Sequence, residues 1–169
     1  NVTQLFPNSR ALLVSGKFID LAMLKKGGAM SIAANGRTHL VLRGALRAAQ
    51  KANSAIIIEI ARSEGGASAY CPVNYWNIAR QVDAVCNELG ITVPVAVHAD
   101  HYGIKKPEDV GPATVEIPTL FEHGLTSIAI DASHMPDDQN LLANLAVNPF
   151  IPASAGLETE VGEIKGSSG

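Results

Sequence analysis

The chain has 169 residues, of which 47% are hydrophobic and 17% are charged, and its formal net charge is −3. This composition is typical of a globular domain with a real core and excludes a disordered chain. The sequence has no run of basic residues and no apolar stretch near the roughly 20 residues that a membrane-spanning helix needs. We therefore expect neither a nucleic-acid partner nor a membrane partner.

The sequence contains two cysteines, Cys71 and Cys86, whose spacing is not that of a metal site. The first ten residues lack the charged region and apolar core of a secretion signal. Both observations favour a reducing cytoplasm, in which we expect the two thiols to be free, one in a loop and the other on a helix.

The expected elements begin with a leader and cap over residues 1–27, which contains an apolar run at 11–14 and a short helix at 20–26. The first β-turn-α unit follows, with a strand at 28–34, a turn at 35–37 and a helix at 38–53. The later elements are a strand at 55–60, a loop at 63–66, a helix at 72–89, a strand at 93–97, a proline-broken helix at 107–122, a strand at 126–130, a helix from 137 or 138 to 146, and a strand at 155–161.

Strands that alternate with helices predict an α/β protein with a parallel sheet. Five such units suit either the first part of a (β/α)8 TIM barrel, which usually needs about 250 residues, or an open doubly wound sheet. We favour a single partial barrel domain, with its β/α units over residues 28–166 and a flexible end or loop fragment at 167–169.

Polar side chains occur at the ends of three successive strands. These residues are Asp100 and His101, then Asp131 with Ser133 and His134, and then Glu158 and Glu160. Because parallel strands bring these ends together, the set predicts a divalent cation site, for which imidazole and carboxylate ligands favour zinc over manganese, cobalt or iron. The alternative is that each acidic residue caps a neighbouring helix.

Three stretches of the sequence, residues 93–101, 124–134 and 157–162, resemble class II, metal-dependent fructose-bisphosphate aldolases and their tagatose-bisphosphate relatives. The first resembles a strand that ends in an Asp-His pair, and the other two resemble the next two strands of that family. The resemblance covers residues 28–166 in the same order and at similar spacing. It implies a (β/α)8 TIM barrel, Zn²⁺ or another divalent cation with room for a second ion, and a phosphorylated sugar substrate.

The resemblance also implies roles for individual residues. Asp100 would exchange the proton of the substrate C4 hydroxyl, His101 would bind the catalytic zinc, and Ser63 would contact the substrate. Asp131 and Glu160 match positions that hold a second or alternative cation. The residues expected to orient these groups are His98, Ser133, His134 and Glu158.

The reaction implied is the reversible cleavage of fructose 1,6-bisphosphate into dihydroxyacetone phosphate and glyceraldehyde 3-phosphate, with the metal as a Lewis acid. Three alternatives stay open: a tagatose-bisphosphate aldolase, a metal-dependent hydrolase in which His98 through His101 are ligands around an activated water, and a non-catalytic barrel fragment. A Schiff-base aldolase is disfavoured because the lysines fall in predicted helices or loops.

The sequence also departs from the family pattern. No segment after Glu160 matches the two further zinc histidines and the glycine-rich phosphate loops, and Ala33-Ala34-Asn35 replaces a more asparagine-rich stretch. We therefore predict that the 169-residue chain is inactive alone, and we expect the protein to form a homo-oligomer.

Overall fold

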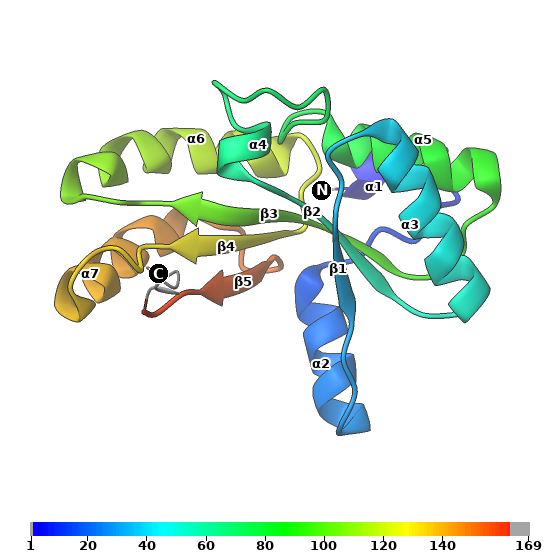
Figure 1. Cartoon of the computed structure of the whole chain (residues 1–169), viewed down its shortest axis with the longest axis horizontal. Helices are drawn as coiled ribbons and strands as arrows, with labels where there is room; N and C mark the ends of the chain where they lie inside the picture. Colours follow the sequence, from blue (N-terminus) through cyan, green and yellow to red (C-terminus); the bar gives the residue numbers. More distant parts are fainter. Residues whose placement is uncertain (1, 163–169) are drawn as a thin grey trace, which may run out of the picture.

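The computed structural model describes residues 2–162, so the expected flexible end at 167–169 lies outside the described residues. A five-stranded sheet occupies the centre of the molecule (Figure 1). Its strands are β1 (Ile32–Asn35), β2 (Ile56–Ala61), β3 (Val95–Gly103), β4 (Ser127–Asp131) and β5 (Gly156–Thr159). The helices are α1 (Val2–Leu5), α2 (Gly16–Lys26), α3 (His39–Ala52), α4 (Arg62–Gly65), α5 (Ile78–Leu89), α6 (Val110–Glu122) and α7 (Asp137–Val147), with 3₁₀ turns η1 (Pro107–Asp109) and η2 (Asn148–Phe150).

The strands are all parallel and follow the order β1-β2-β3-β4-β5. Connections between parallel strands are right-handed as a rule. When the strands follow one another in sequential order, such connections place the connecting helices on the same face of the sheet. A doubly wound sheet would instead reverse its strand order and carry helices on both faces. The parallel α/β prediction is therefore confirmed, and the doubly wound alternative is wrong.

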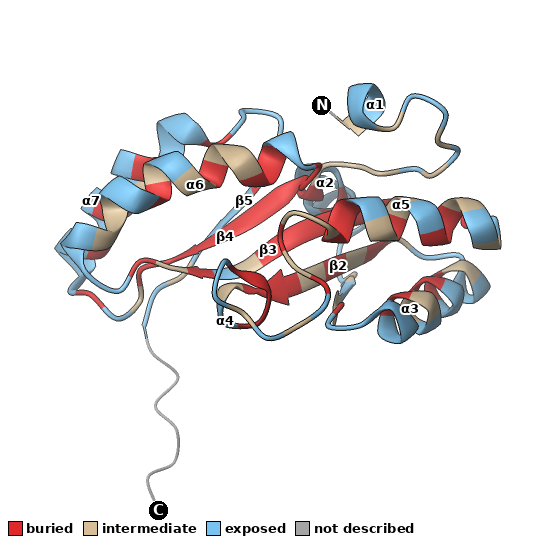
Figure 2. Ribbon diagram, turned by 90° about the horizontal axis from the view of Figure 1, so that it is seen from above, coloured by how far each residue is buried: buried red, intermediate tan, exposed pale blue. Residues whose placement is uncertain are grey.

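One hydrophobic core lies between the sheet and helices α3, α5, α6 and α7. Its members include Ile56, Ile58 and Ile60 of β2 and Leu42 and Leu46 of α3, and the buried positions lie along the sheet and on the helix faces turned toward it (Figure 2). Full burial of an aliphatic side chain of this size contributes about 1.5–3 kcal/mol each. Because side chains alternate along a strand, the remaining residues of each strand face the other side of the sheet, away from these helices.

The segment before α5 differs from the prediction. The helix expected at 72–89 begins only at Ile78, because two asparagine side chains bind the backbone of this segment. Asn77 Oδ1 accepts a hydrogen bond from the Asn74 backbone at 2.9 Å, and Asn74 Oδ1 accepts one from the Trp76 backbone at 3.0 Å. Such local hydrogen bonds compete with those of a helix.

Other boundaries shift by smaller amounts. The expected loop at 63–66 is largely the short helix α4, and α2 starts at Gly16, where Ser15 caps it. Leu13 forms a parallel bridge with Val95 at the start of β3, so the apolar run at 11–14 pairs with the sheet for one residue. In α6 the helix continues through Pro118 to Glu122, without the expected break.

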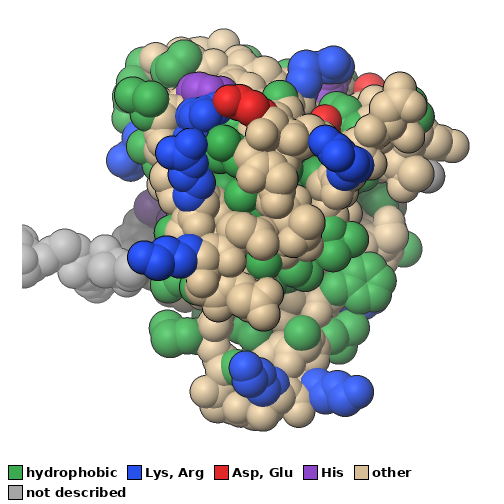
Figure 3. All heavy atoms as spheres, turned by 90° about the vertical axis from the view of Figure 1, so that its right-hand side faces the viewer, with side chains coloured by type: hydrophobic (Ala, Val, Ile, Leu, Met, Phe, Trp, Pro, Cys, Tyr) green, Lys and Arg blue, Asp and Glu red, His purple; other side chains and the backbone are tan. Residues whose placement is uncertain are grey.

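The two cysteines are free, with Cys86 buried on α5 and Cys71 in the loop before it, as expected. Within residues 2–162, no helix combines the length and the apolar character that crossing a membrane requires. Seen from the right of Figure 1, Lys and Arg side chains are distributed over this face from top to bottom, with apolar side chains and backbone atoms between most of them (Figure 3).

Candidate active site

A β-bulge in β3 shapes the site. Between Ala99 and Tyr102, β3 has two residues, Asp100 and His101, where β4 has only one. His101 takes the left-handed conformation, with φ of 43°. The predicted strand ended at residue 97, whereas β3 continues to Gly103 and carries the Asp-His pair within it.

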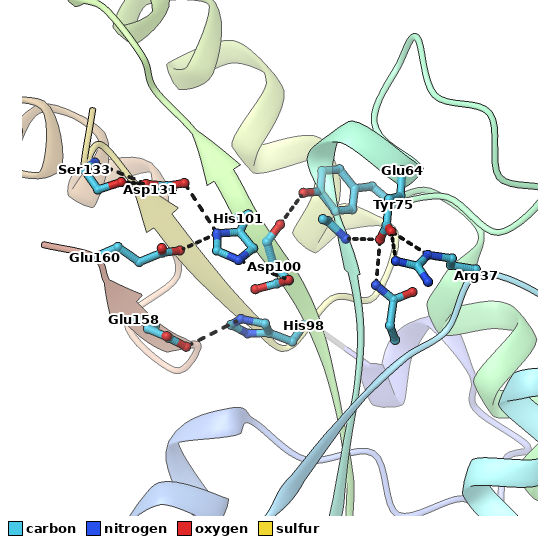
Figure 4. Close-up of polar contacts among 12 residues, drawn as sticks. Arg37, Glu64, Tyr75, His98, Asp100, His101, Asp131, Ser133, Glu158 and Glu160 are labelled. Atoms are coloured by element: carbon cyan, nitrogen blue, oxygen red, sulfur yellow. Dashed lines mark hydrogen bonds and ion pairs between the residues drawn. The ribbon is translucent and has the colours of Figure 1, made fainter. Parts of the chain in front are cut away.

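The bulge decides which way the side chains point. In regular alternation His101 would face the helices and Tyr102 would face the open side of the sheet. The extra residue reverses this, because Tyr102 is fully buried in the core while the His101 side chain is 57% exposed on the open face. Asp100 and His101 therefore lie on the same side of the sheet (Figure 4).

His101 meets one acidic residue at the end of β4 and another directly after β5. Its Nδ1 lies 3.4 Å from Asp131 Oδ2 and 3.1 Å from Glu160 Oε1, while its Nε2 lies 3.9 Å from Asp100 Oδ2 (Figure 4). Partial burial opposes the imidazolium form, but Asp100, Glu160 and Asp131 outweigh it and raise the pKa of His101. The structure thus brings together the three residues predicted as metal ligands.

Asp131 and Glu160 are each held by a neighbour. Ser133 donates to Asp131 Oδ1 from its backbone nitrogen at 3.1 Å and from its hydroxyl at 2.5 Å, which leaves Oδ2 facing His101. Burial would raise the pKa of Asp131, but the hydrogen bonds from Ser133 and His101 lower it. The buried side chain of Asn140 on α7 donates to the Glu160 backbone oxygen at 2.9 Å.

His98 lies deeper on the same face. Its Nδ1 is 2.8 Å from Ser127 Oγ, and its Nε2 is 3.8 Å from Glu158 Oε2. Burial, together with the nearby His101, lowers the pKa of His98 to about 4, so the ring is neutral near pH 7. A neutral imidazole with one engaged nitrogen is compatible both with the predicted supporting role and with a ligand role through Nε2, because ligating histidines also engage their other ring nitrogen, so the supporting role stays a prediction.

Sequence reasoning missed Glu59 on β2. Glu59, His98 and Asp100 each present a ligand-type atom, and these atoms lie within 4.8 Å of one another. Burial, followed by the charges of Asp100 and Glu158, raises the pKa of Glu59 to about 7. An acidic residue inside an otherwise β-branched strand was the available signal, because buried strands rarely contain an unpaired charge.

This shift predicts how stability depends on pH. The folded chain holds the Glu59 proton up to about pH 7, whereas the ordinary value of 4.5 applies when the chain is unfolded. Stability contributed by that proton is present at low pH and is lost as the pH rises through about 7. The glutamine of Glu59→Gln cannot titrate. As the pH rises from 5 to 8, we therefore expect the free energy of unfolding of the variant to increase relative to that of wild type by about 1–2 kcal/mol, a figure reduced to allow for the partial exposure of the side chain.

Urea unfolding of both proteins at pH 5, 6, 7 and 8 measures this difference. The buried His98 contributes an opposite slope, because its stability is lost as the pH falls from 6.5 toward 4. That contribution is common to both proteins and cancels to first order in the comparison. If the free energies of unfolding of wild type and variant changed in parallel with pH, the raised pKa of Glu59 would be contradicted.

A second buried acid, Glu64, organises the neighbouring loops. It accepts hydrogen bonds from Asn35 Nδ2 at 2.6 Å and from Arg37 Nε at 2.5 Å, and it also forms an ion pair with Arg37. Burial would raise the pKa of Glu64, but these partners lower it, so the carboxylate is charged. The contacts tie the end of β1 to α4, which carries Ser63, and the sequence did not reveal them.

A pocket of about 440 Å³ opens beside His101 and Asp131. Its lining includes Ser63 and His134, two residues that were predicted to belong to the site. Two cationic side chains, Arg62 and Lys105, line it as well. Acidic residues line the pocket too, among them Glu116, which forms an ion pair with Arg62, so Lys105 is the one of these two cations that forms no ion pair within residues 2–162.

The His101, Asp131 and Glu160 group fits a divalent cation. The three ligand-type atoms lie within 4.8 Å of one another, and two of the contacts are 3.1 and 3.4 Å. Ligands bound to zinc at about 2.0–2.1 Å in tetrahedral geometry are themselves about 3.3 Å apart. One imidazole with two carboxylates is also a donor set that zinc accepts.

Comparisons with known proteins agree with this fold and with the family resemblance. A family model described as "Fructose-bisphosphate aldolase class-II" matches residues 20–169. The fructose-bisphosphate aldolases of Staphylococcus aureus and Streptococcus pneumoniae are 29% and 33% identical over 122 and 123 residues, which is 72% of this chain in each case. These matches cover only 38% and 37% of the relatives, so the chain spans less than half of their length.

Two solved structures share the fold. The YdjI aldolase of Escherichia coli K12 has a TM-score of 0.65 and 22% identity over 89% of this chain and 51% of that chain. The fructose-bisphosphate aldolase of Campylobacter jejuni has a TM-score of 0.63 and 23% identity, over 92% of this chain and 47% of that chain.

The sequential parallel sheet and these neighbours define an α/β protein with the fold of part of an aldolase TIM barrel. The family model covers most of the sequence, from Asp20 to the last residue. The chain belongs to the class II fructose-bisphosphate aldolase family.

Proposed function

We propose that the protein catalyses the reversible, metal-dependent aldol cleavage of fructose 1,6-bisphosphate to dihydroxyacetone phosphate and glyceraldehyde 3-phosphate. The observation that carries the proposal is the convergence of His101, Asp131 and Glu160 beside Asp100 on the open face of the sheet. Family membership supports the aldolase class, and the names of the curated relatives support this sugar. The proposal concerns the assembled enzyme, because the chain spans only 38% of such a relative.

In this proposal His101, Asp131 and Glu160 hold one divalent cation, for which we propose zinc, in place of the two separate cation positions that the resemblance implies. A bound cation supplies Lewis-acid stabilisation of negative charge that develops on substrate oxygens. Ser133 keeps one Asp131 oxygen occupied, so that the other stays directed at His101. Such outer hydrogen bonds orient ligands and tune their basicity.

Asp100 moves the proton of the substrate C4 hydroxyl. When the bond between C3 and C4 breaks, the Asp100 carboxylate accepts this proton and C4 becomes the aldehyde carbon. The electron pair of that bond passes to the other half as an enediolate, which then takes a proton at C3 to give dihydroxyacetone phosphate. In the condensation direction the same carboxyl group returns the proton to the C4 oxygen. Burial raises the pKa of Asp100 above its ordinary value, although His101 opposes the shift. A base whose pKa lies closer to the working pH exchanges protons more readily in both directions.

The pocket beside His101 would receive the phosphorylated sugar. Ser63 lies exposed on α4 at its edge and would contact the substrate, and Lys105 would offer a positive charge to a phosphate group. His134 lines the same pocket and, like His98 and Glu158, is proposed to support the reacting groups rather than to bind the cation.

The test is to incubate the assembled enzyme with fructose 1,6-bisphosphate and to measure triose phosphate, with and without a chelator; the 169-residue chain by itself is expected to give none. We expect cleavage that the chelator abolishes and that added Zn²⁺ restores. Activity that survives the chelator would overturn the metal mechanism. Failure of the zinc-loaded protein to cleave either fructose or tagatose 1,6-bisphosphate would overturn the aldolase assignment.

A Schiff-base mechanism needs its own experiment, because Lys105 lines the pocket although it lies in a loop. Borohydride traps the imine that a lysine nucleophile forms with a ketose. We expect treatment with substrate and borohydride to leave the activity unchanged. Inactivation with covalent labelling of Lys105 would replace the metal mechanism with a lysine one.

A further inference from the structure

The left-handed conformation of His101 needs an explanation. Among the described residues that are not glycine, Asn53 and His101 have positive φ values, 48° and 43°. Asn53 is a helix C-cap, where that conformation is common. His101 lies inside a strand, where a side chain in this conformation is strained and persists only when its surroundings hold it there.

Two hydrogen bonds hold the backbone on either side of His101. The Tyr75 hydroxyl donates to the backbone oxygen of Asp100 at 3.0 Å (Figure 4). Arg62 Nη1 donates to the backbone oxygen of Gly103 at 2.7 Å. The two acceptors precede and follow His101, so the bulge is tethered at both ends.

Both donors are themselves fixed in place. Tyr75 is fully buried, and its backbone nitrogen donates to Gly65 at the end of α4 at 2.8 Å. Arg62 forms an ion pair with Glu116 at 3.2 Å and lies over the Tyr102 ring, 4.4 Å from its centre. A donor that cannot move restrains its acceptor better than a mobile surface side chain does.

We propose that Tyr75 is a positioning residue, whose hydroxyl, together with Arg62, keeps the β3 bulge in the conformation that aims His101 at Asp131 and Glu160. Without this tether His101 can relax toward extended backbone, and regular alternation would then turn its side chain away from the two carboxylates. The effect on catalysis rests on the proposed aldolase function, whereas the effect on the backbone does not.

The test compares Tyr75→Phe, which removes only the hydroxyl, with Thr119→Val as a matched control. Thr119 accepts a hydrogen bond from the Trp76 indole at 2.9 Å, so the control removes a contact of the adjacent residue without touching β3. The first readout is the ¹³Cα and ¹³Cβ shifts of His101 in the full chain with labelled histidine, since these shifts report backbone conformation. We expect them to move toward extended values in Tyr75→Phe and to stay at wild-type values in the control.

Further readouts are Zn²⁺ affinity by calorimetry and steady-state kinetics. We expect about a tenfold loss of Zn²⁺ affinity and of kcat in Tyr75→Phe, with KM unchanged, because one net hydrogen bond corresponds to roughly that factor. The control should change each value by less than about twofold. A Tyr75→Phe protein that matches the control in shifts, affinity and kcat would overturn the proposal.

The experiment distinguishes failure of the proposed function from failure of the proposed role of Tyr75, and it also covers a variant that does not fold. If the assembled wild-type enzyme cleaves no ketose bisphosphate, the proposed function fails, while the His101 shifts and Zn²⁺ affinity still decide the role of Tyr75. If Tyr75→Phe does not fold by circular dichroism, Arg62→Met removes the other tether from a partly exposed site and carries the same expectation for the His101 shifts.

Discussion

Replacement of Asp100 by asparagine is expected to lower kcat for fructose 1,6-bisphosphate cleavage by about 10²–10⁴-fold, the range typical of a lost general base. Asparagine keeps the shape of the side chain but cannot take the C4 hydroxyl proton. Zn²⁺ affinity should change little, because His101, Asp131 and Glu160 form the proposed cation group without Asp100. The variant thus separates proton transfer from cation binding.

The measurement is kcat and KM for the zinc-loaded wild type and variant, with Zn²⁺ affinity determined by calorimetry on the same preparations. Glu122→Gln serves as a charge-matched control, because Glu122 is an exposed carboxylate at the end of α6. An Asp100→Asn protein that loses Zn²⁺ as well as activity would contradict the division of roles. In that case Asp100 would be part of the cation site, as the hydrolase alternative supposes for this stretch.

Replacement of His101 by alanine is expected to weaken Zn²⁺ binding by at least about 100-fold, because even outer-sphere substitutions cost about 10–100-fold. The change removes the imidazole from the group and leaves two carboxylates facing each other. It also removes the positive partner that His101 offers when protonated, so the pKa of Glu160 should rise further above its ordinary value. Activity in the presence of limiting Zn²⁺ should fall in parallel.

His123→Ala is the matched control for this experiment. His123 is an exposed histidine at the C-terminal end of α6, and its Nδ1 lies 2.7 Å from the Thr119 backbone oxygen. Calorimetric titration with Zn²⁺ should give wild-type affinity for this variant. Equal affinity of His101→Ala and wild type would show that the cation, if bound, is held elsewhere.

Much of the site could be predicted because the carboxyl ends of parallel strands lie at the same edge of a sheet. That rule, applied to residues 93–101, 126–134 and 155–161, led to the grouping of Asp100, His101, Asp131 and Glu160 that the structure brings together. The resemblance to class II aldolases rests on the same three stretches, and the family model now supports it. Element limits were less accurate, because local asparagine contacts delay α5 until Ile78.

The sequence by itself determined the parallel α/β pattern, the polar residues of three strand ends and the family. Only the tertiary structure decided that His101 and Asp100 share one face, because the bulge depends on the register between β3 and β4. The pKa of Glu59 was equally out of reach, since it depends on burial and on charges from β3 and β5. The tether from Tyr75 to Asp100 joins residues 25 positions apart, and no local pattern in the sequence encodes such a contact.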